Sequence, residues 1–182
     1  YGWSGSLQIE AFGAALQFSD PLAMAGAALI VAALFLKAAV VPFHAWAPDA
    51  YEGASAPVTA FMATVIKAGV LLAALRIFGT TPVLQPMLGL VAVLPLLSMA
   101  WGNLAAIRQV SFRRMIAYSS IGHAGYLFYA LLGDGEGRWQ AIVFYVIAYG
   151  LMNLLAFAAL PRGADDARGS GNGGAGQPAL RR

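Results

Sequence analysis

Long uncharged, apolar stretches dominate the chain. No residue between Asp20 and Lys37 is charged, and none is charged between Arg76 and Arg108. A helix needs about 20 mostly apolar residues to cross a membrane. The pattern predicts five membrane-spanning helices joined by short loops, over residues 21–47, 57–78, 86–107, 115–132 and 139–160. No span has the alternating polarity of a membrane β-strand, so we expect an all-α, polytopic membrane helix bundle.

The first predicted span contains a proline, Pro42, near its inner end. An unbroken helix from Asp20 to Ala47 would measure about 40 Å, which exceeds the ~30 Å hydrocarbon core of a bilayer. Proline removes a backbone donor and clashes with the preceding turn. Breaks at membrane depth are tolerated where they line a cavity, and in transporters they mark ion pathways. We therefore expect an interruption between about Lys37 and Phe43, with a plain proline kink of no functional role as the alternative.

Composition agrees with a membrane protein and excludes several other classes. The 182 residues are 60% hydrophobic and only 10% charged, whereas a soluble domain is about 25% charged. A free-standing soluble enzyme and a disordered chain are thereby excluded. Without cysteine there is no disulfide framework, no thiolate metal site and no cysteine nucleophile. The formal net charge of +3 is too small to indicate nucleic acid, so the expected surroundings are the lipid bilayer.

Lysine and arginine in the short loops predict the orientation. One side of the membrane receives the loop over 108–114 and the tail over 161–182, which together hold most of the arginines. The other side receives Arg76 and Arg138. The positive-inside rule places the first side in the cytoplasm, and the loop over 48–56 falls on that side as well.

Both ends of the chain look unlike those of a complete membrane protein. The sequence begins at Tyr1 without an initiator methionine, and we expect a fragment of a larger protein. Residues 161–182 are rich in Gly, Ala, Arg and Asp. We expect this tail to be polar and disordered, and residues 1–160 to form the transmembrane region.

Three ionisable residues share one predicted depth. Lys37, Lys67 and His123 each lie nine or ten residues from the cytoplasmic end of their span. That is roughly 15 Å, near the centre of a ~30 Å hydrocarbon slab. A charge there costs on the order of 2.5–3.5 kcal/mol, so these side chains should face a bundle interior or a water-filled path. Because burial disfavours the charged form of both residue types, all three are candidates for proton relay.

Simpler interpretations of these residues stay open. Either lysine could extend its ammonium to the interface, and His123 could be a packing histidine. His44 lies two turns beyond Lys37, where it could extend a proton path to the inner surface or be an ordinary interfacial histidine.

Two predicted helices carry polar side chains along one face. These residues are Ser119, His123 and Tyr126 in one helix, and Tyr145, Tyr149 and Asn153 in the other. Polar faces of this kind commonly hold membrane helices together. Trp46, Tyr51 and Trp139 lie near span ends and are expected in the aromatic belt, while Arg113 and Arg114 are expected to anchor the inner interface. No phosphate loop, metal-ligand spacing or Ser/His/Asp arrangement occurs, so we expect no cofactor or metal on this chain.

Three segments of the sequence resemble a known membrane-protein family. They are KAAVVPFHAWAPDAYEGA from Lys37, followed by PVTAF and by Lys67; GNLAAIRQ from Gly102; and RRMIAYSSIGHAGY from Arg113. These residues are similar to the proton-translocating, antiporter-like subunits of respiratory complex I, the NADH-quinone oxidoreductase. The PDAYEG form resembles the N-type subunits more than the L- and M-type ones. The resemblance covers residues 1–160.

The resemblance implies a fold and a set of roles. Family members contain two inverted helix repeats, each with a broken helix. The family's broken-helix lysine falls on Lys37 and its central-axis lysine on Lys67, which implies that both relay protons. The resemblance also implies a bacterial inner membrane, other membrane subunits as partners, and NAD, FMN, iron–sulfur clusters and quinone bound elsewhere in the complex. The glutamate that partners the Lys37 position in the family, and the second broken helix, fall outside this sequence.

Two other functions remain as alternatives. The chain could come from a cation/proton antiporter or a related membrane-bound hydrogenase, with no role in quinone reduction. It could also be a non-functional fragment with structural content only. The PDAYEG form argues against the antiporter, and neighbouring genes would discriminate between the two complexes.

Overall fold

The computed structural model describes residues 5–8, 11, 21–80, 88–133 and 137–159, and its regular elements there are all helical. The helices are α2 (Pro21–Ala38), α3 (Trp46–Gly53), α4 (Ala56–Phe61), the π-helical turn η1 (Met62–Ile66), α5 (Lys67–Thr80), α6 (Leu88–Ile107), α7 (Phe112–Ala130) and α8 (Arg138–Ala158). The predicted all-α class is confirmed. The predicted disordered tail lies outside the described residues.

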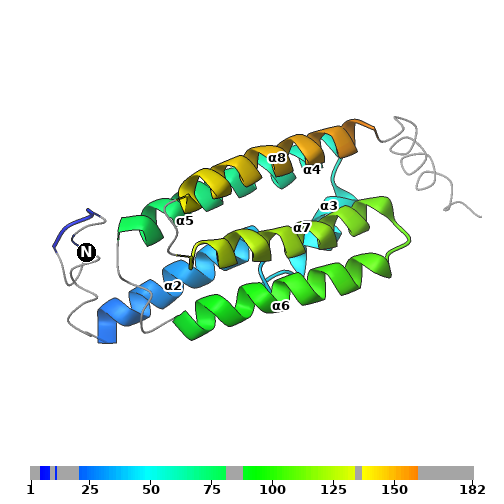
Figure 1. Cartoon of the computed structure of the whole chain (residues 1–182). Coiled ribbons are helices and arrows are strands. Elements are labelled where there is room, and N and C mark those ends of the chain that lie inside the picture. The colour runs from blue at the N-terminus through cyan, green and yellow to red at the C-terminus, as the bar shows by residue number, and fades with distance from the viewer. Residues whose placement is uncertain (1–4, 9–10, 12–20, 81–87, 134–136, 160–182) are drawn as a thin grey trace, which may run out of the picture.

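The long helices lie side by side in one elongated bundle (Figure 1). α4, η1 and α5 continue into one another as a single rod, and α6 packs along α7 more extensively than any other described pair. The short helix α3 packs on α7, at the end of the bundle where α6 connects to α7 (Figure 1). Segments 48–56 and 108–114 therefore share one end of the bundle, as the loop charges predict.

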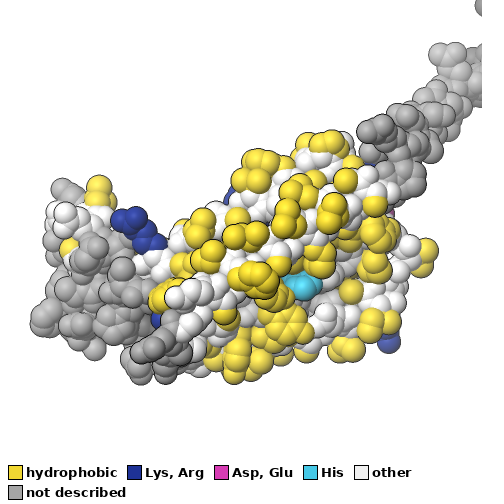
Figure 2. Space-filling view, turned by 45° about the horizontal axis from the view of Figure 1, so that its top comes forward, with side chains coloured by type: hydrophobic (Ala, Val, Ile, Leu, Met, Phe, Trp, Pro, Cys, Tyr) yellow, Lys and Arg dark blue, Asp and Glu magenta, His cyan; other side chains and the backbone are white. Residues whose placement is uncertain are grey.

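Three described helices are long and apolar enough to cross a membrane: Pro21–Ala38, Ala56–Ile77 and Arg138–Ala158. A shorter apolar helix, Val91–Ile107, falls in the third predicted span. α7 covers most of the fourth predicted span but is less apolar, because it carries two arginines, two serines and a histidine. Hydrophobic side chains are spread over the face of the bundle that Figure 2 shows, as expected for a bundle whose solvent is lipid.

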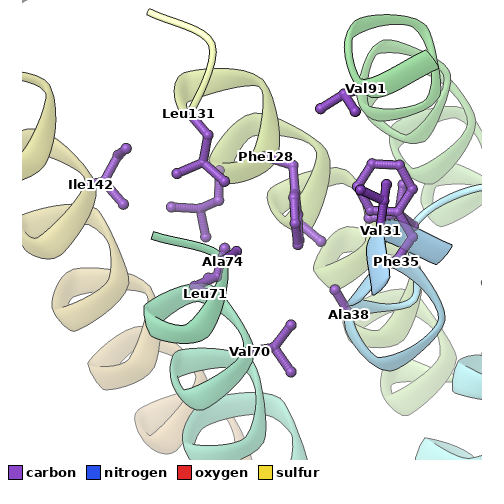
Figure 3. Close-up of a cluster of buried hydrophobic side chains, with 13 residues drawn as sticks. Val31, Phe35, Ala38, Val70, Leu71, Ala74, Val91, Phe128, Leu131 and Ile142 are labelled. Carbon is purple, nitrogen blue, oxygen red and sulfur yellow. The ribbon is translucent and has the colours of Figure 1, made fainter. Parts of the chain in front are cut away.

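The hydrophobic core joins five helices. Phe35 of α2 and Phe128 of α7 are fully buried, and their rings meet edge to face with centroids 5.1 Å apart. Around this pair lie buried side chains from α5, α6 and α8, among them Leu71, Val91 and Ile142 (Figure 3). Because the core ties α2 to α7, it fixes the end of α2 relative to the polar residues of α7.

The predicted interruption of the first span is confirmed. α2 ends at Ala38, Ala39 has a left-handed φ of 61°, and α3 begins at Trp46. The Val41–Pro42 peptide bond is cis. The expected loop over 48–56 is wrong in its first part, because α3 extends over Trp46–Gly53. The chain resumes a helix directly after the break because this segment packs against α7.

Side chains add to the local backbone hydrogen bonds that close the break, such as the one from the Val40 N–H to the Phe35 carbonyl at 2.9 Å. The Val41 N–H donates to Ser98 Oγ of α6 at 2.7 Å. The indole Nε1 of Trp46 donates to the Leu36 carbonyl at 2.9 Å. Such partners are required, because a free backbone group at membrane depth costs several kcal/mol. Trp46 therefore has a structural role in addition to its position near a span end.

α6 and α7 approach each other at backbone contact distance. A Cβ on Gly102 would lie 2.5 Å from the Gly122 nitrogen, and a Cβ on Gly125 would lie 2.5 Å from the Pro95 carbonyl oxygen. Small residues allow this approach between membrane helices. The two helices therefore form a tightly fitted pair that carries both Ser98 and the polar face of α7.

Candidate functional site

Lys67 follows directly after a π-helical turn in the α4–α5 rod. The turn spans Met62–Ile66, and within it Thr64 Oγ1 donates to the Ala60 carbonyl at 2.7 Å. π-Turns are rare and often occur at functional sites. Since the turn contains one residue more than an α-helical turn, it rotates the following residues about the helix axis. Lys67 is buried in the bundle, with 6% of its surface exposed, which confirms the expectation that it faces the interior.

The ammonium of Lys67 is held by neutral oxygen atoms of one residue. Its Nζ donates to the Ser120 carbonyl at 2.5 Å and also contacts Ser120 Oγ. The Tyr149 ring lies below it, with the centroid 5.9 Å from Nζ. Among the described residues Lys67 has no carboxylate partner. A buried amine with hydroxyl and carbonyl partners can donate a proton without first breaking an ion pair.

Tyr51 of α3 extends this contact towards the end of the bundle where α3 packs on α7. Its hydroxyl lies 3.4 Å from Ser120 Oγ, and the residue is 1% exposed. Its backbone carbonyl accepts from Thr59 Oγ1 at 3.3 Å. The expectation that Tyr51 belongs to the aromatic belt is wrong, because α3 packs inward against α7 and buries the ring.

His123 joins the polar faces of α7 and α8. Its Nδ1 lies 2.6 Å from the Tyr145 hydroxyl, and its ring centroid lies 4.7 Å from that of Tyr149. The two polar faces predicted from spacing therefore meet. Tyr126, on the same face of α7, instead accepts from Asn103 of α6 at 3.3 Å. Lys67 thus binds Ser120, and His123 binds Tyr145. The Tyr149 ring lies beside both Lys67 and His123, so these five residues form one polar cluster.

A cavity of about 360 Å³ opens beside this cluster. It is lined mainly by apolar side chains of α6, α7 and α8, with Ser119, Tyr149 and Asn153 as polar members. The Tyr149 hydroxyl is buried and has no hydrogen-bond partner among the described residues. Tyr149 is therefore shared between the cavity wall and the surroundings of Lys67.

The structure does not bring Lys37 into this cluster. Lys37 lies in the last turn of α2 and its side chain is exposed on the surface of the chain, so the expectation that it faces a bundle interior or a water-filled path stays a prediction. His44 lies in the break and is half-buried. Its Nδ1 is buried without a partner among the described residues, and its ring centroid is 6.2 Å from that of Trp101.

Arginines at the start of α7 bind α3. Arg114 pairs with Asp49 at 2.8 Å and with Glu52 at 3.0 Å. Arg113 donates to the Ala54 carbonyl at 2.8 Å. These contacts fix the segment after the break to α7, and they agree with the prediction that both segments face the same side of the membrane.

Sequence reasoning missed two serines. Ser120, the partner of Lys67, lies three residues before His123, a spacing that does place it on one helical face with the histidine. Ser98, the partner of the break, lies in a largely apolar helix whose spacing gives no sign of a contact with the break. Among the described residues, no group of three or more His, Asp or Glu side chains could hold a metal ion.

Comparison with known proteins identifies close relatives over most of the chain. The family model described as "NADH:quinone oxidoreductase/Mrp antiporter, TM" matches residues 1–166. NADH-quinone oxidoreductase subunit N of Methylococcus capsulatus is 44% identical over 182 residues, covering 93% of this chain and 36% of that protein. The protein of the same name from Pelobacter propionicus is 42% identical over 168 residues, covering 91% and 36%. The chain therefore spans 36% of the length of these relatives.

Solved structures share the fold. Respiratory complex I from Thermus thermophilus contains a chain 40% identical to this one, with a TM-score of 0.66, covering 82% of this chain and 36% of that chain. An archaeal membrane-bound sulfane sulfur reductase aligns with a TM-score of 0.77 at 30% identity, covering 87% and 34%. The Mrp complex from Dietzia aligns with a TM-score of 0.74 at 28% identity, covering 86% and 29%.

Proposed function

The chain belongs to the NADH:quinone oxidoreductase/Mrp antiporter transmembrane family, and we propose that it is part of subunit N of a proton-translocating NADH-quinone oxidoreductase. The relatives named above support this assignment through their names and their identity over most of the chain. In this proposal the chain contributes a lysine-based proton path and carries no redox chemistry of its own.

The observation that carries the proposal is the buried Lys67 amine beside neutral partners. A protonated amine is stabilised by the Ser120 oxygens, and a neutral amine can still donate to the Ser120 carbonyl while accepting from the Ser120 hydroxyl. Both protonation states therefore have some support, as a relay requires. A lysine whose role is packing alone would gain more from a carboxylate partner.

His123 is the next proton-carrying group in the proposed path. No direct hydrogen bond joins it to Lys67 in the described residues, so transfer needs an intermediate. Tyr149 contacts both, and its unpaired hydroxyl can bind a bridging water. Tyr145, bound to His123 Nδ1, then holds the imidazole in one orientation.

Lys37 and His44 belong to the proposed path at the helix break. Broken helices mark ion pathways because their free backbone groups and adjacent side chains face polar space. The exposed position of Lys37 is consistent with a path whose other wall comes from the remaining part of the protein. His44, with a buried and unpaired Nδ1, lies towards the cytoplasmic end of the same path.

The proposal places the chain in an assembly. Its partners are other membrane subunits of the oxidoreductase, and its location is the inner, or plasma, membrane of a bacterium. NAD, FMN, iron–sulfur clusters and quinone act in other parts of the complex, so coupling to electron transfer is indirect.

A cation/proton antiporter or related respiratory complex is the second candidate. The Mrp and sulfane sulfur reductase complexes align with higher TM-scores than complex I does, whereas sequence identity is highest for complex I. We give sequence identity more weight, because the fold is common to the whole family and side chains determine function.

Ion dependence in the full-length protein separates the two candidates. The gene is deleted in its host and restored, and proton uptake by inverted membrane vesicles is recorded. The oxidoreductase proposal predicts uptake that is driven by NADH, lost on deletion and unaffected by removal of sodium. Sodium-driven proton exchange in the absence of NADH would instead support the antiporter.

A further inference from the structure

The break in the first membrane helix is anchored by one hydroxyl from a distant helix. Ser98 lies 57 residues after Val41 in the sequence, and its Oγ accepts from the Val41 N–H at 2.7 Å. The same hydroxyl donates to the Leu94 carbonyl at 3.1 Å, one turn earlier in α6. Ser98 is fully buried. The hydroxyl therefore donates one hydrogen bond and accepts another, which fixes its direction.

The backbone at the break is held by local hydrogen bonds together with one tertiary contact. Ala39 has a φ of 61°, in the left-handed region that a residue with a Cβ adopts at a cost. Such conformations persist only where surrounding contacts determine them. Ala39 and Val40 are both buried, and the Val41 N–H is directed at α6 rather than along its own helix. The left-handed turn is closed by backbone hydrogen bonds from the Ala39 and Val40 N–H groups to the Leu36 and Phe35 carbonyls, and the bond to Ser98 adds the tertiary anchor for the residues that follow.

The helix that carries Ser98 is locked to the helix that carries the lysine's partner. α6 touches the backbone of α7 at Gly102 and at Pro95, which faces Gly125. These two contact points lie before and after Ser98 in α6. α7 presents Ser120 to Lys67. Movement of the break relative to α6 would therefore also be movement relative to the Lys67 contact.

We propose that Ser98 is a positioning residue for proton transfer, which fixes the broken helix, with Lys37 and His44 on its two sides, in register with the Lys67–Ser120 contact. The inference rests on the proposed function. Ser98 carries no proton itself. Its hydroxyl sets the distance that a proton crosses between the break and the central lysine, and proton transfer is sensitive to misplacement of this kind.

The test uses the full-length subunit assembled in its complex, with Ser98→Ala, Ser98→Thr and the control Ser111→Ala. Ser111 precedes α7 and its side chain makes no capping hydrogen bond, so its variant removes an equivalent hydroxyl elsewhere. The readouts are protons translocated per NADH oxidised, normalised to assembled complex, and hydrogen exchange of the peptide covering residues 39–45. We expect Ser98→Ala to lower the proton ratio and to accelerate exchange in this peptide by roughly fivefold, the effect of losing one hydrogen bond. Ser98→Thr keeps the hydroxyl and should retain the proton ratio.

Several results would overturn the inference. One is a Ser98→Ala variant with the parent's proton ratio and the parent's exchange. Another is faster exchange with an unchanged ratio, which would leave Ser98 with a structural role only. If Ser98→Ala does not assemble, hydrogen exchange in the unaltered protein tests the inference. An unprotected Val41 amide would contradict the hydrogen bond from Val41 to Ser98. A Lys67→Ala variant measured in parallel distinguishes failure of the proposed function from failure of the proposed role of Ser98. If Lys67→Ala also translocates protons normally, the proposed function is wrong.

Discussion

Lys67 and Ser120 meet across 53 residues of sequence, with the Lys67 Nζ 2.5 Å from the Ser120 carbonyl oxygen and in contact with its hydroxyl. The carbonyl belongs to the backbone and the hydroxyl to the side chain, so a substitution of Ser120 removes only the hydroxyl. The contact joins the rod that contains the π-turn to α7. It is the structural basis for regarding Lys67 as a relay.

Removal of the serine hydroxyl should weaken proton transfer without abolishing it. In Ser120→Ala the carbonyl still accepts from Lys67, but the hydroxyl that also contacts Tyr51 is lost. A hydrogen bond to a charged group contributes about 1.5–3 kcal/mol, so we expect the proton translocation rate to fall by roughly tenfold or more. The measurement is NADH-driven proton uptake by vesicles that contain assembled complex. An unchanged rate in Ser120→Ala would mean that the hydroxyl takes no part in the path.

The close packing of α6 and α7 predicts intolerance of any side chain at Gly102. A Cβ there would lie 2.5 Å from the Gly122 nitrogen, and backbone cannot yield as a flexible side chain can. Gly102→Ala should therefore destabilise the subunit by about 1–3 kcal/mol, the usual cost of overpacking. Thermal denaturation of the detergent-solubilised protein provides the measurement. Gly150→Ala in α8 is the matched control, because a Cβ there meets nothing within 4 Å. Equal melting temperatures of the two variants would contradict the packing argument.

The left-handed Ala39 predicts a stabilising substitution. Glycine adopts positive φ without the Cβ penalty, so Ala39→Gly should raise stability by about 0.5–1 kcal/mol. The same change at Ala28, in the middle of α2, should lower stability by about as much, because glycine weakens a helix interior. Comparison of the two melting temperatures in detergent checks this prediction. A loss of stability in both variants would show that Ala39 is not strained.

Topology can be tested with single cysteines, since the chain has none of its own. Asp49→Cys and Arg108→Cys replace exposed residues, and the first also removes one of the two carboxylates that pair with Arg114. We expect both to be protected in intact cells from an impermeant thiol reagent and to be labelled after permeabilisation. Arg76→Cys, predicted on the opposite side, should be labelled in intact cells. Labelling of the first two from outside would reverse the orientation.

The sequence allowed the break and the burial of Lys67 to be predicted, each for a physical reason. Pro42 cannot continue a helix hydrogen-bond ladder, and the span that contains it is too long for the bilayer. Lys67 is equally far from both membrane surfaces, so its ammonium has no short route to water. Burial inside the bundle avoids the cost of a charge in lipid. Spacing also predicted the polar faces of α7 and α8, though not the contact between His123 and Tyr145, which depends on how the two helices pack.

Other features depend on tertiary structure that periodicity does not report. The π-turn at Met62–Ile66 shifts the helical face by one residue before Lys67, so a regular helical wheel does not identify its partner. Tyr51 lies near a predicted span end, which indicates the aromatic belt, whereas helix α3 packs inward and buries it. The exposed position of Lys37 was not predicted, because depth along a helix does not determine which side of that helix is covered.

The central claim is that Lys67 carries protons, and substitution by arginine tests it most directly. A guanidinium keeps the positive charge and the length of the lysine but does not release its proton at neutral pH. In the full-length subunit, assembled in its complex and reconstituted in vesicles, we expect Lys67→Arg and Lys67→Ala both to suppress NADH-driven proton translocation per assembled complex. The matched control is Arg76→Lys, which preserves the charge at an exposed position at the far end of the same rod and should translocate protons like the parent. An arginine variant that translocates protons at the parent rate, beside an inactive alanine variant, would contradict the relay and leave Lys67 as a structural charge.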